Sequence, residues 1–468
     1  MRHRILALAT AATLALAIPE ASALGTGEVT RAELQALEAQ LQAQMQAFAE
    51  RLGRLEGENA ELRAVVARRD AEIDSLKAQS GALQEQGAEA AGEIARVKGA
   101  DWATRISFKG DLRVRGESIR TERVAGSGPD ATVEDAADRN RMRYRARLSA
   151  EARVTERSKV VLGIASGDGD PRSTNQTFDD IGSGKGVRFD LAYADWAFAP
   201  GAHLVLGKHR QPFRRTGQSL FFDTDINPEG AAVTYERGMF FGSAYAWWLQ
   251  EDYSPDPAGN DEDAYLLGAQ GGIVFPLAGG ETRLAAHYYD CGGCRHNSPF
   301  WSDGGPYGNT TVPKDTGSGT VEVLAYDYDV IVLSGQVNLA LLGRPLLLWA
   351  DWARNLASGV EYDTAYNLGA FLGSTSAPRS WEAGLMYQSM DKDAMFAQLI
   401  DADFAAGNTD GDGWLFRVGY APVRNVVLNA TYMLNSLNKD VAPVAGPGFE
   451  TGRDLDYDRL QLDVNYRF

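Results

Sequence analysis

The feature that most constrains the fold of this chain is a two-residue alternation of apolar and polar side chains that recurs between residues 104 and 468. In residues 104–118 the odd positions are mostly charged, whereas the even positions include Ile106, Phe108 and Leu112. Residues 141–154 and 459–468 repeat the alternation. A period of two predicts β-strands with one apolar and one polar face, and strands of about ten residues are long enough to cross a bilayer at a tilt.

The lengths of the links between these strands favour a membrane barrel over a soluble sandwich. Short links such as 200–201 and 342–344 alternate with long ones such as 210–230 and 290–320, and only the link at 354–361 departs from the trend. Short turns at one end and long loops at the other are typical of an outer-membrane barrel, whose closure pairs every backbone N–H and C=O group in lipid. We predict an all-β transmembrane barrel of about 16 antiparallel strands, preceded by an N-terminal α-helical coiled coil. The strands are expected to start near residues 104, 141, 159, 187, 202, 231, 240, 263, 281, 328, 345, 361, 379, 413, 425 and 457.

The first residues indicate export. Arg2 and Arg4 precede an apolar stretch over residues 5–18, and Ala21-Ser22-Ala23 matches the A-x-A cleavage pattern of a signal peptide. We predict a signal peptide over residues 1–23; an uncleaved anchor is the alternative, although the stretch is short for a spanning helix. Beyond it no run of about 18 uncharged apolar residues occurs, which excludes a helical membrane protein.

Residues 30–98 have a helical period that repeats every seven residues. Between Met45 and Val97, 12 of the 16 seam positions are apolar, and Asn59 occupies a core position. A sustained heptad repeat predicts a left-handed coiled coil, and a buried Asn favours two strands over three. We therefore predict a periplasmic coiled coil over residues 24–99 that makes the protein a homo-oligomer, and a barrel over residues 100–468. The alternative is a single amphipathic helix that lies on the barrel.

Composition and motifs exclude several functions. The net charge of −17 and the pI near 4.9 argue against nucleic acid as a partner. His287, Cys291, Cys294 and His296 could be written as zinc ligands, but Cys291 and Cys294 lie in a long loop, and we predict a local disulfide rather than a metal site. The sequence offers no catalytic set of a nucleophile, a base and a group that orients the base, so we expect neither an enzyme nor a bound cofactor.

The predicted lumen face carries concentrated positive charge. With the odd positions of the first two strands taken as inward, nine basic side chains face only Asp111, Glu117 and Glu151. A water-filled pore would screen these like charges, whereas a packed core could not. Alternatively, the arginines pair with acidic side chains on loops that fold inward. Screening by water and pairing with loop carboxylates can also occur together. The predicted pore-lining residues are Arg105, Lys109, Arg113, Arg115, Arg141, Arg143, Arg145 and Arg147.

The loop over residues 210–230 is the predicted constriction. Basic side chains gather at one end of it and acidic ones at the other, so an inward fold would set opposite charges across the pore. These residues are Arg210, Arg214, Arg215, Asp223, Asp225 and Glu229.

Six stretches of the barrel sequence stand out: RMRYRARL (141–148), DPRSTNQT (170–177), LAYADW (191–196), LGKHRQPF (206–213), DINPEG (225–230) and DADF (401–404). Together they resemble the proteobacterial "putative porin" family of outer-membrane barrels, and the likeness covers about residues 100–468. The resemblance implies a passive diffusion channel without a defined substrate, often with an N-terminal coiled-coil segment, and it implies no catalytic residues.

The expected partners follow from the barrel. The chain ends on Phe468 after alternating apolar residues, which resembles the C-terminal signal recognised by the bacterial outer-membrane assembly machinery. We expect an outer-membrane porin in contact with lipid and lipopolysaccharide, with its coiled coil in the periplasm, that passes small solutes or ions and prefers anions. The alternative function is a structural anchor whose coiled coil tethers the barrel toward peptidoglycan.

Overall fold

The computed structural model describes residues 31–96, 103–126, 132–167, 169–251, 263–277, 279–300, 305–317, 319–440 and 454–468. The chain divides into two compact units, residues 1–99 and 100–468. The predicted signal peptide over residues 1–23 lies outside the described residues. Within the described ranges, no helix combines the length and the apolarity that crossing a membrane requires.

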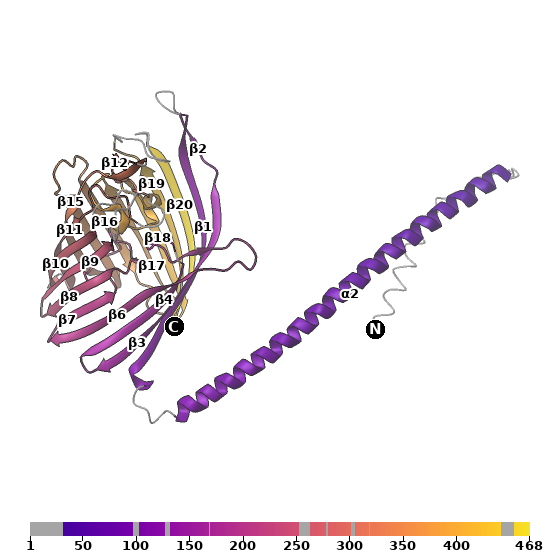
Figure 1. Ribbon diagram of the computed structural model, residues 1–468, viewed down its shortest axis with the longest axis horizontal. Coiled ribbons are helices and arrows are strands. Elements are labelled where there is room, and N and C mark those ends of the chain that lie inside the picture. Colours follow the sequence, from indigo (N-terminus) through magenta and orange to yellow (C-terminus); the bar gives the residue numbers. More distant parts are fainter. Residues whose placement is uncertain are drawn as a thin grey trace. The chain divides into compact units, whose positions relative to one another are not determined.

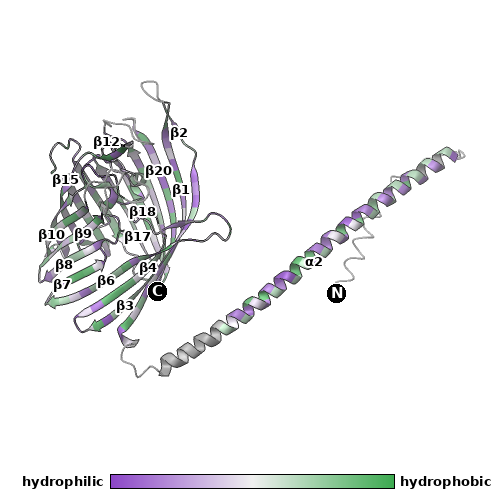
Figure 2. Cartoon of the chain, in the orientation of Figure 1, coloured by the Kyte–Doolittle hydropathy of each residue, from purple (hydrophilic) through white to green (hydrophobic). Residues whose placement is uncertain are grey.

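The described part of the first unit is one continuous helix, α2 (Arg31–Arg96), of 66 residues (Figure 1). At 1.5 Å per residue it is about 100 Å long. Hydrophilic and hydrophobic residues are interspersed along the coloured part of the helix (Figure 2). Met45, Phe48 and Leu62 of the predicted seam are 68%, 63% and 62% exposed. Because a coiled coil needs a second helix against this seam, the predicted association stays a prediction.

In the second unit, 16 strands form a closed antiparallel barrel, which confirms the predicted fold class (Figure 1). Each strand pairs with its neighbours along the chain, and pairing of the first strand with the last closes the wall, from Asp111↔Arg467 to Thr121↔Tyr457. The strands are β1 (Ile106–Ala125), β3 (Arg139–Thr155), β4 (Ser158–Ser166), β6 (Val187–Ala199), β7 (Ala202–Lys208), β8 (Glu229–Arg237), β9 (Phe240–Gln250), β10 (Ala264–Leu277), β11 (Gly280–Gly292), β14 (Asp329–Leu341), β15 (Arg344–Asn355), β16 (Thr364–Gly373), β17 (Ser380–Met390), β18 (Gly411–Val423), β19 (Val426–Leu437) and β20 (Leu455–Arg467).

Four shorter strands belong to the loops. β2 (Thr132–Asp135) pairs with the end of β1, and β5 (Gln176–Thr177) pairs with β3. β12 (Thr311–Asp315) and β13 (Thr320–Leu324) form a separate hairpin within the link between β11 and β14.

The strands start close to their predicted positions. The largest difference is at β16, which starts at Thr364 rather than near residue 361. The links 156–157, 200–201, 238–239, 342–343 and 424–425 lie at one end of the barrel, which we call the short-turn end. The links 167–186, 209–228, 293–328 and 391–410 lie at the other, the long-loop end. With an even number of strands, the barrel begins and ends at the short-turn end.

Side chains alternate between the lumen and the outside of the wall. In β1, Arg115 and Glu117 are buried, whereas Phe108 and Leu112 are exposed. Other exposed outward side chains include Leu385, Phe416, Leu434 and Leu462. An outward band of apolar residues is what a barrel wall in lipid requires.

One side of the lumen is filled by loops. Phe213 of the 209–228 link packs against Trp247 of β9 and His287 of β11, with ring centroids 6.2 Å and 4.4 Å apart. Phe404 of the 391–410 link joins a second apolar cluster with Trp349 and other inward residues. Another part of the lumen is lined by charged side chains of β1, β3 and β20, among them Arg115, Arg141 and Arg459.

Candidate functional site

The polar side of the lumen is built on β1 and β3. Their register places Arg113 directly opposite Arg145, and Arg115 directly opposite Arg143. Because like charges in such positions repel one another, counter-charges or water must screen them. We call this surface the arginine wall; it comprises Lys109, Arg113, Arg115, Arg141, Arg143, Arg145 and Arg147.

Toward the short-turn end, two carboxylates neutralise two guanidiniums of the wall. Asp111 accepts hydrogen bonds from Arg145 and Arg147, each at 2.8 Å. Asp225, on the 209–228 link, lies 3.5 Å from Arg145 and 3.1 Å from Arg147. Burial raises the pKa of Asp225, but the neighbouring guanidiniums outweigh burial and hold this pKa below its usual value. The Asp225 carboxylate is therefore ionised at neutral pH and ties its loop to the wall.

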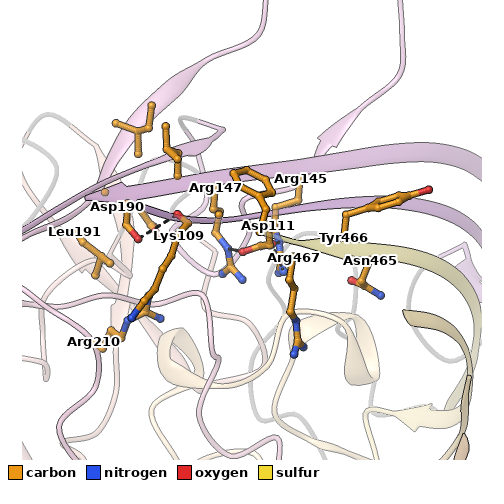
Figure 3. A pocket seen from close by; sticks show the side chains of 16 residues that line it. Lys109, Asp111, Arg145, Arg147, Asp190, Leu191, Arg210, Asn465, Tyr466 and Arg467 are labelled. Carbon is orange, nitrogen blue, oxygen red and sulfur yellow. Dashed lines mark hydrogen bonds and ion pairs between the residues drawn. The ribbon is translucent and has the colours of Figure 1, made fainter. Parts of the chain in front are cut away.

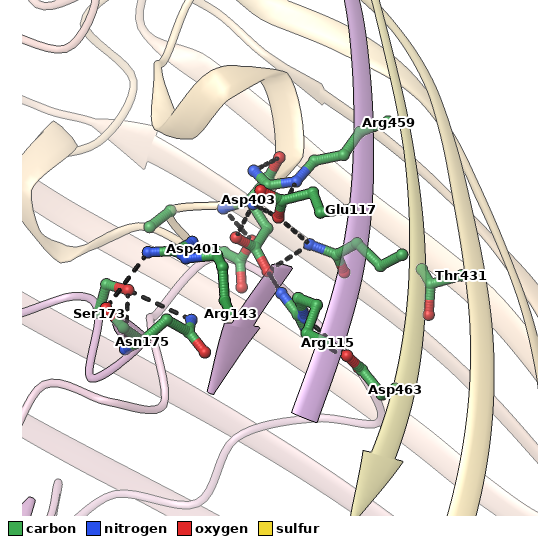
Figure 4. Close-up of polar contacts among 12 residues, drawn as sticks. Arg115, Glu117, Arg143, Ser173, Asn175, Asp401, Asp403, Thr431, Arg459 and Asp463 are labelled. Carbon is green, nitrogen blue, oxygen red and sulfur yellow. Dashed lines mark hydrogen bonds and ion pairs between the residues drawn. The ribbon is translucent and has the colours of Figure 1, made fainter. Parts of the chain in front are cut away.

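Toward the long-loop end, Arg115 donates to Asp403 and to Asp463, in both cases at 2.7 Å (Figure 4). Asp403, on the 391–410 link, also accepts from Arg459 of β20 at 2.7 Å. Burial raises the pKa of Asp403, but Arg459 and Arg115 outweigh burial and hold the pKa well below its usual value. A second loop is thus tied to the wall by charge.

Glu117 is the most enclosed carboxylate of the wall, because its side chain is 0% exposed. It forms ion pairs with Arg141 and with Arg459. Counting these pairs with those above, five guanidiniums meet five carboxylates, so this part of the wall is balanced in charge. They belong to Arg115, Arg141, Arg145, Arg147 and Arg459, and to Asp111, Glu117, Asp225, Asp403 and Asp463.

Arg113 and Arg143 stand outside this balance. No carboxylate in the described parts of the chain lies within ion-pair distance of either guanidinium. Arg113 donates to the side-chain oxygen of Asn175 at 2.6 Å, and Arg143 donates to the main-chain oxygen of the same residue at 3.4 Å. The Nε of each arginine is buried and has no acceptor among the described residues.

The predicted constriction loop does lie inside the barrel, but its basic side chains face separate partners. Arg214 forms an ion pair with Glu236 and lies over the ring of Phe241, 4.4 Å from its centroid. Arg215 donates to a main-chain oxygen of its own loop at 3.2 Å. Arg210 lines a cavity beside the arginine wall. The basic and acidic ends therefore do not form one opposed pair across the lumen.

Asp223 joins the two inward loops to each other. Its carboxylate accepts the main-chain N–H of Asp225 at 2.7 Å and that of Ala402 at 3.0 Å. Burial, followed by the charges of Asp401 and Asp225, raises the pKa of Asp223 well above its usual value. The role of Asp223 is thus to bind main-chain N–H groups of the two loops rather than to place a negative charge in the lumen.

Two predicted site residues lie elsewhere. Glu229 begins β8 with its side chain 68% exposed, and it pairs with Lys208 of β7 at 3.0 Å. Ala232 is the buried residue of β8, and Glu229 lies opposite the exposed Trp248 of β9, so Glu229 faces outward and its constriction assignment was wrong. Arg105 lies in a 3-10 turn (Ala103–Arg105) before β1, where strand alternation does not set its direction.

Sequence reasoning missed the part played by two other links, 167–186 and 391–410. Arg172 is buried, donates to the main-chain oxygen of Gly407 at 2.9 Å and lies 3.7 Å from the centroid of the Tyr307 ring. Thr174 donates to Asp225 at 3.2 Å. Ser173, Ala402 and Asp403 line one cavity, so the stretches 170–177, 225–230 and 401–404, three of the six that carry the family resemblance, meet inside the barrel. Their shared resemblance was the signal that could have identified them.

Two cavities follow the arginine wall. One of about 350 Å³ is lined by Lys109, Asp111, Arg145, Arg147 and Arg210, among others (Figure 3). Another of about 430 Å³, nearer the long-loop end, is lined by residues that include Arg139, Arg141, Arg143, Ser173 and Asp403. Charged side chains therefore line space on both sides of Arg113.

The two cysteines lie away from the wall. Cys291 and Cys294 are paired in a disulfide, with their Cα atoms 5.7 Å apart, and both are fully buried. His287 accepts or donates a hydrogen bond at 2.8 Å with the hydroxyl of Tyr245. All three residues are buried and belong to the packed side of the lumen.

The family described as "Putative porin" matches residues 120–299 and 320–468, which is more than half of the chain. Among solved structures, the chain is similar to OprB of Pseudomonas putida (13% identity, 81% of this chain and 97% of that chain, TM-score 0.47). It is also similar to a loop L8 deletion mutant of OmpT of Vibrio cholerae (12% identity, 78% and 99%, TM-score 0.43) and to a mutant of Rh. blastica porin (11% identity, 78% and 100%, TM-score 0.42). No curated protein sequence matches the chain. By its family match, the chain belongs to the putative porin family.

Proposed function

We propose that the protein is an outer-membrane channel through which small hydrophilic solutes or ions diffuse passively, with a preference for anions. The observation that carries this preference is the arginine wall. Four of its guanidiniums, with Arg459 of β20, form ion pairs with carboxylates, whereas Arg113 and Arg143 add positive charge and form no ion pair with a carboxylate of the described residues.

The net charge of the whole chain does not decide the selectivity. Although the chain carries −17, ions respond to the potential along their path, where low-dielectric walls focus nearby charge. Carboxylates more than about 10 Å from that path are largely screened at 0.1 M salt. The unbalanced guanidiniums should therefore outweigh acidic residues on the outer loops.

Reversal potentials of the purified protein in planar bilayers, measured under a potassium chloride gradient, test this proposal. We expect a preference for chloride, and we expect the double change Arg143→Glu and Arg145→Glu to move the channel toward potassium. A wild type that prefers potassium and responds little to these changes would contradict the anion preference and would assign selectivity to the loop carboxylates.

A second candidate function is a structural anchor, which the length of α2 favours. A helix of 66 residues with an exposed apolar seam suits a tether toward peptidoglycan, formed by a periplasmic coiled coil of two or more chains. A barrel that folds in detergent but conducts no ions in planar bilayers would favour the anchor over the channel.

The proposed assembly adds three elements to either function. Signal peptidase removes residues 1–23, the coiled coil over residues 24–99 makes a homo-oligomer, and the outer-membrane assembly machinery recognises the C-terminal strand that ends in Phe468. In support of the last, the main chain of Phe468 is hydrogen-bonded to Gly110 of β1 at 2.9 Å and 3.0 Å, so this end forms part of the closing seam.

A further inference from the structure

We propose that Arg113, Arg143 and Asn175 form a binding site for one oxyanion group, a carboxylate or a phosphate, of a solute that crosses the lumen. This site rests on the proposed channel function, because a solute reaches it only along the lumen. Beyond a general preference for anions, it gives the channel a defined position where one chemical class of solute binds.

The first argument is that the nearby carboxylates are already engaged. Along β1, Arg113 lies two residues from Asp111, which accepts from Arg145 and Arg147. On the other side lies Asp403, which Arg115 and Arg459 bind. The guanidiniums of Arg113 and Arg143 therefore have no fixed counter-ion among the described residues.

The second argument is that the two guanidiniums converge. Because Arg113 pairs with Arg145 and Arg115 pairs with Arg143, Arg113 and Arg143 are diagonal neighbours across two strands. Diagonal neighbours are about 7–8 Å apart, within reach of long side chains. Both donate to Asn175, at 2.6 Å and 3.4 Å, so their ends meet at one residue.

Asn175 is itself held in place. It is buried, and its side-chain nitrogen donates to the hydroxyl of Ser173 at 3.3 Å. This bond leaves its side-chain oxygen for Arg113. The position of Asn175 relative to the wall is also maintained by Thr174, which donates to Asp225. The site is therefore organised before any solute arrives.

The third argument is that donors are left over. The Nε of Arg113 and the Nε of Arg143 are buried without an acceptor among the described residues, which is unfavourable for a strong donor. A planar guanidinium presents its N–H groups as a fork that matches two oxygens of a carboxylate or phosphate. An oxyanion supplies both the missing acceptors and the missing negative charge.

Cavities lie on both sides of the site. Arg143 lines the cavity of about 430 Å³ toward the long-loop end (Figure 4 shows Arg143 beside Ser173 and Asn175). Asp111 and Arg145, two residues beyond Arg113 and across from it, line the cavity of about 350 Å³ (Figure 3). Both volumes fall within the range of small-molecule sites.

The surroundings predict weak rather than tight binding. Asp403 and Asp170 line the same cavity as Arg143, and although each is bound by arginine, their charge still repels an anion. A channel site must be favourable enough for entry and weak enough for release. We therefore expect half-saturation at about millimolar concentration.

The test is the chloride conductance of single channels, measured while inorganic phosphate or acetate replaces part of the chloride at constant ionic strength. We expect a saturable fall in conductance beyond the loss of chloride itself. R113Q and R143Q should each raise the half-saturating concentration about tenfold, and R113K should raise it too because an ammonium lacks the fork. Saturation by both anions indicates a site for any oxyanion, and saturation by phosphate alone indicates a phosphate site.

The matched control is K109Q, which removes one positive charge from the same wall outside the site. Its half-saturating concentration should stay within about twofold of the wild type. Saturation by neither anion, or an equal loss in K109Q and R113Q, overturns the proposed site. Gel mobility before and after boiling establishes that each variant is folded.

Failure of the site and failure of the channel are distinguishable. A wild type that prefers chloride in the gradient experiment but shows no saturation rejects the site alone. A folded barrel that conducts no ions rejects the channel function and the site with it. A channel that prefers potassium yet saturates with phosphate rejects the anion preference and supports the site.

Discussion

Replacing Asp225 with Asn isolates the effect of one loop carboxylate on ion selectivity. Asp225 lies within 3.5 Å of Arg145 and 3.1 Å of Arg147, and its lowered pKa means that it carries a full negative charge at neutral pH. Asn keeps the shape and one acceptor oxygen but removes the charge. The loop should stay inside the barrel, because Phe213, Phe221 and Phe222 keep their apolar contacts. The change therefore leaves two wall guanidiniums less neutralised.

The size of the effect follows from Coulomb's law. A unit charge about 7 Å from a passing ion in water changes its energy by about 0.6 kcal/mol, and screening at 0.1 M salt reduces this to about 0.3 kcal/mol. Because the signs for chloride and potassium are opposite, their permeability ratio changes by about 0.6 kcal/mol, which is about threefold toward chloride.

Glu229→Gln is the matched control. It also removes one carboxylate from the sequence segment 210–230, but Glu229 is exposed on the outside of the wall beside Lys208. Reversal potentials under a potassium chloride gradient should shift for Asp225→Asn and stay at the wild-type value for Glu229→Gln. An equal shift in both variants, or no shift in either, would refute the assignment of Asp225 to the ion path.

Three further predictions concern assembly and stability. As an outer-membrane barrel, the protein should migrate differently on a detergent gel before and after boiling, and recovery of the mature protein from soluble periplasmic extracts would contradict the membrane barrel. Deleting residues 30–98 should leave a folded barrel but weaken the oligomer, and Asn59→Leu should strengthen association while loosening its stoichiometry; identical cross-linked oligomers with and without the segment would reject the coiled coil. Burial, followed by the charges of Asp401 and Asp225, raises the pKa of Asp223 in the folded barrel. The contribution of this carboxyl to the free energy of unfolding is therefore complete below the usual pKa of 3.8, and it is lost as pH rises through the raised pKa of the folded state. Asp223→Asn should therefore flatten the decline in stability with rising pH, measured as the temperature of the gel-mobility change, and an unchanged decline would show that other groups cause it.

The strands could be predicted because their signal is local. A period of two in side-chain polarity defines each strand, and antiparallel strands joined in chain order take their register from the turns between them. This is why β6, β7 and β9 start at the predicted residues 187, 202 and 240, and why the odd residues of β1 face the lumen as expected. The heptad repeat is equally local, but the association that it predicts involves a second chain.

What the tertiary structure alone decided is which charges meet. Arg115 and Asp403 are 288 residues apart in the chain, and Arg459 and Glu117 are 342 apart. No period or spacing in the sequence encodes such contacts, because they depend on barrel closure and on the path of loops held by apolar packing. The same path separates Asp225, which faces the wall, from Glu229, which faces outward. The sequence by itself therefore determined the barrel and the positive face of its lumen, whereas only the folded loops decided that most of these arginines form ion pairs and that Arg113 and Arg143 form none with the described carboxylates.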